Sequence, residues 1–189
     1  MTDSKVSFWH KVRNFFNGPI DSSTSRVTND SNDPNQQSRV FKISDFSKVL
    51  DPKDIVLDVK AASKNELLKY LANLVSNSNT TVNTEEIYGK YLVREKNCPT
   101  DLGSGIALPH VQVESITKLT MLVVKLQRSI KWSKSESVDI VISFLVPETD
   151  KNYQYIPYLA SVARLLLRPS FVQSLRQTKN KFAIVKLFK

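Results

Sequence analysis

The chain has 189 residues, of which 41% are hydrophobic and 24% are charged, and its formal net charge is +9. This composition suits one globular domain with an appendage, and a domain of this size needs no disulfide or metal to stabilise its core. A single cysteine, Cys98, excludes an internal disulfide, and two histidines exclude most zinc sites, so we expect neither metal nor cofactor. Every apolar run is shorter than the ~20 residues of a membrane helix, and we expect a cytoplasmic protein.

The first 40 residues differ in composition from the rest of the chain. Residues 17–40 are rich in Asn, Ser, Asp, Thr and Gln, which predicts a flexible linker. Four apolar residues before it recur at helical spacing: Phe8, Val12, Phe15 and Phe16. Residues 7–16 therefore predict a short amphipathic segment, which a partner, a membrane surface or the protein's own domain could receive, and plain disorder is the alternative. We divide the chain into a flexible, disordered N-terminal extension, residues 1–40, and a domain, residues 41–189.

Regular secondary structure is predicted from residue 41 onward. Ile55–Val59 has the composition of a strand. Ser63 and Glu66 have the capping-box spacing of a helix N-terminus, and leucines follow them at helical spacing. Thr84 is predicted to cap a second helix, whose apolar face includes Tyr91.

The second half of the chain adds two long strands and more helices. Leu119–Leu126 and Val138–Val146 are so apolar that we expect them inside a sheet covered on both faces. A helix is predicted over Tyr153–Leu167, with Pro157 in its first turn, and Ser170 is predicted to cap a shorter helix. The expected inward residues of the longer helix are Ile156, Leu159, Ala163 and Leu166.

The C-terminal tail is ambiguous, but the overall class is not. Residues Lys181–Phe188 suit either a helix or a strand by periodicity. Strands that alternate with helices elsewhere in the chain favour a layered α/β domain.

Residues 94–110 are the segment most informative for chemistry. Two of the four glycines in the chain, Gly103 and Gly105, flank Ser104 there. Glycine tolerates positive φ, and successive backbone N–H groups in such a turn can surround an anion. Arg94 supplies a guanidinium, the other donor suited to phosphoryl oxygens.

His110 ends this segment, directly after a proline. Pro109 fixes its own φ and keeps Leu108 extended, so His110 is expected on a stiff backbone beside a short buried strand. A free imidazole has a pKa of about 6.5, so a neutral, nucleophilic ring is available near neutral pH. The pattern thus suits phosphoryl transfer through His110, although a histidine with a purely structural role in a turn fits it too.

The residues Arg94-Glu95, Thr100 and Gly103-Ser-Gly-Ile-Ala-Leu-Pro-His110 together resemble a family signature. It is that of the fructose/mannitol class of enzyme IIA domains, which belong to the phosphoenolpyruvate-dependent sugar phosphotransferase system. The nitrogen-regulatory branch is the more similar one, and the likeness extends over residues 44–188. The resemblance implies an α/β fold with a mixed central β-sheet flanked by α-helices on both faces.

The resemblance also implies roles for individual residues. His110 would accept a phosphoryl group from a histidine phosphocarrier protein, and Arg94 would stabilise that group. The implied phosphate-binding residues are Thr100, Gly103, Ser104 and Gly105.

Two positions depart from the family pattern. Family members read Leu-Gly-Ser-Thr-Gly where this chain reads Asn97-Cys-Pro-Thr-Asp101, and Asp101 adds a negative charge that would weaken phosphate binding. The family also carries a histidine after its Val-Pro strand, where this chain has Tyr155, or Gln154 if the alignment shifts by one. A tyrosine hydroxyl donates a hydrogen bond but does not titrate near neutral pH, so Tyr155 is a candidate neighbour of the phosphoryl site with a reduced role.

Three functions are compatible with the sequence. The first is a phosphocarrier that regulates partner proteins, expected to have acidic surfaces, through the phosphorylation state of His110. The second is a degenerate enzyme IIA-like binding module that is never phosphorylated. The third is a protein that associates weakly with membranes or with polyanions such as nucleic acid, through the Phe8–Phe16 segment and a basic face. No Asp or Glu follows Asp150, although a solvated basic face explains that run as well. No motif indicates specific nucleic-acid binding.

Overall fold

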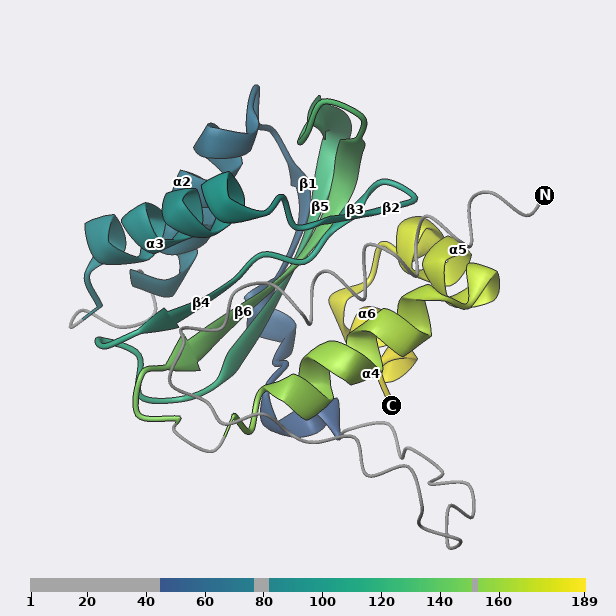
Figure 1. Cartoon of the computed structure of the whole chain (residues 1–189). Helices are drawn as coiled ribbons and strands as arrows, with labels where there is room; N and C mark the ends of the chain where they lie inside the picture. Colours follow the sequence, from purple (N-terminus) through teal and green to yellow (C-terminus); the bar gives the residue numbers. More distant parts are fainter. Residues whose placement is uncertain (1–44, 77–81, 151–152) are drawn as a thin grey trace, which may run out of the picture.

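The computed structural model describes residues 45–76, 82–150 and 153–189. The predicted N-terminal extension, with its amphipathic segment 7–16, lies outside the described residues. The described residues form a layered structure, in which a β-sheet lies between two groups of helices (Figure 1).

The central layer is a mixed sheet of six strands within the described residues. They are β1 (Ile55–Val59), β2 (Asp101–Gly103), β3 (Ile106–Ala107), β4 (His110–Val113), β5 (Thr120–Lys131) and β6 (Ser137–Pro147). The order is β1-β5-β6-β3-β2, and β4 pairs with β6 beyond the end of β3. Strands β1 and β5 are parallel, as are β3 and β4 to β6, whereas β5 runs antiparallel to β6 and β2 to β3.

The helices cover both faces of the sheet. They are α2 (Lys64–Ser76), α3 (Thr84–Asn97), α4 (Ile156–Leu166), α5 (Pro169–Gln177) and α6 (Lys181–Leu187), with short 3₁₀ turns at Phe46–Lys48 and Pro52–Asp54. Helices α2 and α3 lie on one side, and α4, α5 and α6 lie on the other (Figure 1). Two apolar clusters fill the two interfaces, and both draw alternate residues from β5 and β6. The predicted α/β class and the burial of both long strands are confirmed.

The predicted helix caps are partly corrected. Ser63 Oγ accepts the backbone N–H of Glu66 at 3.2 Å, as predicted, while the Glu66 carboxylate reaches back to the N–H of Ala62. In α3 the cap is Asn83 rather than Thr84, because the Asn83 side chain accepts the N–H groups of both Glu85 and Glu86. Helix α5 starts at Pro169, one residue before the predicted cap, since proline suits the first helical position.

Helix α4 begins at Ile156, three residues later than predicted. The Asp150 carboxylate accepts the N–H groups of Gln154 and Tyr155, at 3.1 and 3.3 Å, and holds the preceding chain in a turn. Pro157 lies in the first turn as predicted, but Ile156 is 37% exposed rather than inward. The ambiguous tail is helical, because Asn180 caps it through the N–H of Ala183.

A break between β3 and β4 sets the position of the site. Both strands run parallel to β6, with Ile106 opposite Ile140 and His110 opposite Phe144. Pro109 lies in the gap, where it has no N–H to donate but its carbonyl accepts the N–H of Phe144 at 3.1 Å. His110 therefore begins a strand on a backbone held by the central strand of the sheet.

Candidate functional site

The structure brings Arg94 and His110 together, although they are 16 residues apart in sequence. Arg94 lies in the last turn of α3, and α3 packs against β4, which begins at His110. The Arg94 Nε–H points at Nε2 of His110 across 3.5 Å. A guanidinium and an imidazole thus face each other at the end of a helix and the start of a strand.

The hydrogen bonds of His110 indicate which ring nitrogen carries the proton and which keeps its lone pair. Nδ1 lies 3.1 Å from the carbonyl oxygen of Leu108, which accepts only, so Nδ1 carries the proton. Nε2 then keeps its lone pair, which is consistent with its accepting a bond from Arg94. The carbonyl that fixes the tautomer belongs to Leu108, the residue directly before Pro109.

The surroundings keep the imidazole neutral. Burial lowers the pKa of His110 to about 4, and the Arg94 guanidinium acts in the same direction, while the bond to Leu108 opposes both. The ring nevertheless retains some exposed surface, so it is accessible to a partner molecule. At neutral pH the ring is therefore uncharged and nucleophilic.

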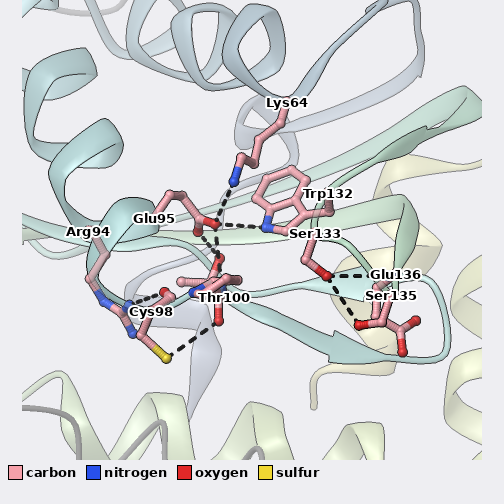
Figure 2. A network of polar contacts seen from close by, with 10 residues as sticks. Lys64, Arg94, Glu95, Cys98, Thr100, Trp132, Ser133, Ser135 and Glu136 are labelled. Carbon is pink, nitrogen blue, oxygen red and sulfur yellow. Dashed lines mark hydrogen bonds and ion pairs between the residues drawn. The ribbon is translucent and has the colours of Figure 1, made fainter.

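A second set of contacts holds Arg94 in place. Its Nη1 donates to the carbonyl of Cys98 at 2.6 Å, and the Cys98 N–H donates back to the Arg94 carbonyl at 3.2 Å. Figure 2 shows the Arg94 guanidinium beside Cys98, while the neighbouring Glu95 extends toward the other side of the helix. The end of α3 thus folds back onto its own arginine.

Glu95 is a buried carboxylate with four hydrogen-bond donors around it. Thr100 donates both its N–H, at 3.3 Å, and its hydroxyl, which makes a short contact. Trp132 Nε1 donates at 3.0 Å and Lys64 Nζ at 3.4 Å (Figure 2). Only 4% of Glu95 is exposed, so these donors replace water around the charge. Sequence reasoning missed this network, although Glu95 belongs to the signature that identified the family.

Thr100 lies within this network rather than open to a ligand. It is fully buried, its hydroxyl donates to Glu95, and its carbonyl accepts the N–H of Leu108 at 3.0 Å. The structure gives Thr100 a role in joining the end of α3 to the backbone before His110. Its direct binding of phosphate stays a prediction.

The structure does not bring the glycine turn to His110. The carbonyl of Gly105 accepts the N–H of Ile140, whereas the carbonyl of Pro109 accepts that of Phe144, four residues further along β6. Four strand residues span about 13 Å.

Another arginine occupies that turn. Gly103, Ser104 and Gly105 all have positive φ, and Arg176 of α5 donates to the Ser104 carbonyl at 2.7 Å. Arg176 also makes two bonds of 2.8 Å to Asp139, and a side chain at Gly105 would lie 2.6 Å from that carboxylate. In this structure the three residues form a turn whose backbone is bound by the Arg176 guanidinium. Their binding of phosphate stays a prediction.

The two departures from the family pattern occupy different places. Tyr155 is half-buried at the start of α4; burial raises the pKa of its hydroxyl, and the Arg94 charge opposes that rise. Its place beside the phosphoryl site stays a prediction. Asp101 is buried at the start of β2, opposite Ala107, and its effect on phosphate binding stays a prediction.

Comparison with known proteins decides the family. Residues 48–189 match the family described as "Phosphoenolpyruvate-dependent sugar phosphotransferase system, EIIA 2". The chain belongs to this family. A nitrogen regulatory protein of Bradyrhizobium diazoefficiens is 30% identical over 141 residues, which are 74% of this chain and 91% of that protein. Another from Pseudomonas aeruginosa is 25% identical over 144 residues, 75% of this chain and 93% of that protein.

Solved structures of enzyme IIA proteins share the fold. The nitrogen regulatory protein IIA-Ntr of Neisseria meningitidis superposes with a TM-score of 0.70 at 21% identity, covering 77% of this chain and all of that one. The mannitol IIA protein of Escherichia coli gives a TM-score of 0.61 at 23% identity, covering 74% of this chain and 99% of that one. The predicted family, and its likeness to the nitrogen-regulatory branch, are confirmed. Membership of this family, with nitrogen regulatory proteins among the relatives, supports a phosphocarrier or regulatory role.

None of the helices formed by residues 45–76, 82–150 and 153–189 has the length and apolar character to cross a bilayer.

Proposed function

We propose that this enzyme IIA protein carries a phosphoryl group on Nε2 of His110 and regulates other proteins through its phosphorylation state. The observation that carries the proposal is the neutral imidazole with Nδ1 directed to the Leu108 carbonyl and Nε2 directed to Arg94. A nucleophile, a group that sets its tautomer and a cation for the phosphoryl oxygens are thereby assembled in one place.

The transfer follows from this geometry. Nε2 of His110 attacks the phosphorus of a phosphohistidine on a histidine phosphocarrier protein, and the N–P bond of the donor breaks as the new N–P bond forms. The proton stays on Nδ1, hydrogen-bonded to the Leu108 carbonyl. That carbonyl also stabilises the positive charge that develops on the ring. Arg94 moves from the imidazole lone pair to the incoming oxygens, which its guanidinium binds as a fork.

Regulation is proposed to work through charge and through exposed apolar side chains close in sequence to Arg94 and Tyr155. A phosphoryl group adds about −1.5 to −2 charges at neutral pH, on a chain whose net charge is +9. Val93, next to Arg94, is 61% exposed, and Tyr153 and Ile156, on either side of Tyr155, are 39% and 37% exposed. A partner with an acidic, partly apolar surface would bind the unphosphorylated form and be repelled by the phosphorylated one.

The test is intact-protein mass spectrometry after incubation with phosphoenolpyruvate and the two upstream phosphotransferases. We expect one acid-labile phosphoryl in the wild type and none in His110→Ala. His10→Gln, which changes the second histidine, is the matched control and should be phosphorylated normally. An acid-labile group that persists in His110→Ala would refute the assignment. A wild type that never gains the group would favour the alternative of a degenerate binding module, in keeping with Tyr155 at the place of a family histidine.

A further inference from the structure

We propose that Glu95, acting through Thr100, is a positioning residue that holds Arg94 against His110. The inference rests on the proposed phosphoryl transfer and adds a residue that acts on the site without touching the reacting atoms. It begins from the hydrogen bonds that join the end of α3 to the strand of the histidine.

These bonds form a closed circuit around the site. From the histidine, Nδ1 binds the Leu108 carbonyl, and the Leu108 N–H binds the Thr100 carbonyl at 3.0 Å. Thr100 in turn donates twice to Glu95, the chain neighbour of Arg94. The Arg94 Nε–H then returns to Nε2 of the histidine. Thr100 and Glu95 therefore form a hydrogen-bonded link between Arg94 and His110.

The link also shapes the segment that holds the guanidinium. Glu95 and Thr100 are five residues apart, and Cys98, whose carbonyl accepts Arg94 Nη1, lies between them. Closing that short loop fixes the direction of the Cys98 carbonyl. Without the closure, the arginine would lose a 2.6 Å acceptor, and its side chain would be less restrained.

The carboxylate itself is held from outside the loop. Trp132, directly after β5, and Lys64, at the start of α2, both donate to Oε2 of Glu95 (Figure 2). No buried polar side-chain atom among the described residues lacks a hydrogen-bond partner, so the network is complete. A complete network of charged and neutral groups is rigid, as a group that aims a catalytic arginine must be.

The variants separate positioning from simple destabilisation. Thr100→Val removes the hydroxyl and keeps the shape, Glu95→Gln replaces one acceptor oxygen by a donor, and Thr100→Ser restores the hydroxyl. Tyr91→Phe is the matched control, because Tyr91 also lies in α3 and its hydroxyl makes a buried bond of 2.6 Å to Ser143 outside the circuit. It should lower stability without moving Arg94.

The first readout needs no phosphorylation. NMR titration of the full chain, with the His110 signal assigned by its absence in His110→Gln, reports the pKa of the histidine. Since the Arg94 charge lowers that pKa, its displacement should raise it toward the value in Arg94→Ala. We expect this rise in Thr100→Val and Glu95→Gln, recovery in Thr100→Ser, and no change in Tyr91→Phe.

The second readout is the rate of phosphorylation of His110. We expect a loss on the order of 10-fold in Thr100→Val, because a misplacement of 1 Å can cost about 100-fold. The loss should appear in kcat rather than in KM for the donor, and it should vanish when Arg94 is already alanine. An unchanged histidine pKa together with additive rate losses would overturn the inference. If even the wild type is not phosphorylated, the proposed function fails, while the NMR titration still decides whether Glu95 positions Arg94.

Discussion

The backbone segments just before and just after β3, the glycine turn and His110, each have an arginine beside them, yet the two arginines have different partners. At the glycine turn, Arg176 binds the carboxylate of Asp139 through two hydrogen bonds and a backbone carbonyl through a third. At His110, Arg94 donates to a carbonyl and to a neutral imidazole. A guanidinium neutralised by a carboxylate stabilises the fold, whereas one facing an imidazole lone pair can exchange that partner for an anion.

The largest expected effect separates the two arginines by function. Arg94→Ala should raise the activation free energy for phosphorylation of His110 by about 2–4 kcal/mol, as for the loss of a single donor to a developing oxyanion. Thermal stability should change little. Rapid-quench measurement of phosphoryl transfer and thermal denaturation check the two halves. Normal transfer with a large loss of melting temperature would make Arg94 structural and remove the contrast with Arg176.

The neutral histidine should make stability depend on pH. Its folded pKa of about 4 lies below the value of about 6.5 in the unfolded chain, so the unfolded state binds the extra proton between these values. The contribution of the neutral His110 to the free energy of unfolding is present above pH ~6.5 and is lost as pH falls toward ~4. The loss amounts to roughly 3 kcal/mol at most. Urea denaturation across this range checks it, with His110→Gln as the reference. Parallel pH profiles for the two proteins would contradict a buried, neutral imidazole.

Substitutions in the glycine turn should change the stability of the protein rather than the rate of phosphoryl transfer. Gly105→Ala places a methyl group 2.6 Å from the Asp139 carboxylate at φ +76°, so we expect a loss of about 2–3 kcal/mol in unfolding free energy. Gly103→Ala is the matched control, since φ is +88° but nothing lies within 4 Å of the added atom, and a loss of about 1 kcal/mol is expected. Chemical denaturation measures both. Equal losses would show that backbone strain, and not the Arg176–Asp139 clamp, makes glycine necessary at residue 105.

The smallest effect is expected for the structural arginine. Arg176→Ala breaks an ion pair whose side chains are 41% and 31% exposed, so water screens much of its strength. With the bond to the Ser104 carbonyl also lost, we expect about 1 kcal/mol of stability and an unchanged rate of phosphorylation. Denaturation and the same transfer assay check this. A strong loss of phosphorylation would mean that the glycine turn and its clamp act on the site after all.

The sequence alone determined the parts of this protein that depend on local pattern. The apolar runs of β5 and β6 predicted buried strands, the Ser63–Glu66 spacing predicted a helix start, and the residues around His110 identified the family. These succeed because periodicity, capping and signature spacing are properties of neighbouring residues.

Tertiary structure decided everything that depends on which strands become neighbours. Because β3 and β4 pair with different stretches of β6, Gly105 and Pro109 bind β6 at points four residues apart, which separates the glycine turn from His110. Helix α5 then brings Arg176 to the glycine turn from 72 residues away in sequence. The same packing buried Glu95 among Thr100, Trp132 and Lys64, which no local pattern connects. A buried carboxylate must collect donors from wherever the chain supplies them, so only the assembled fold reveals how Arg94 is held beside His110.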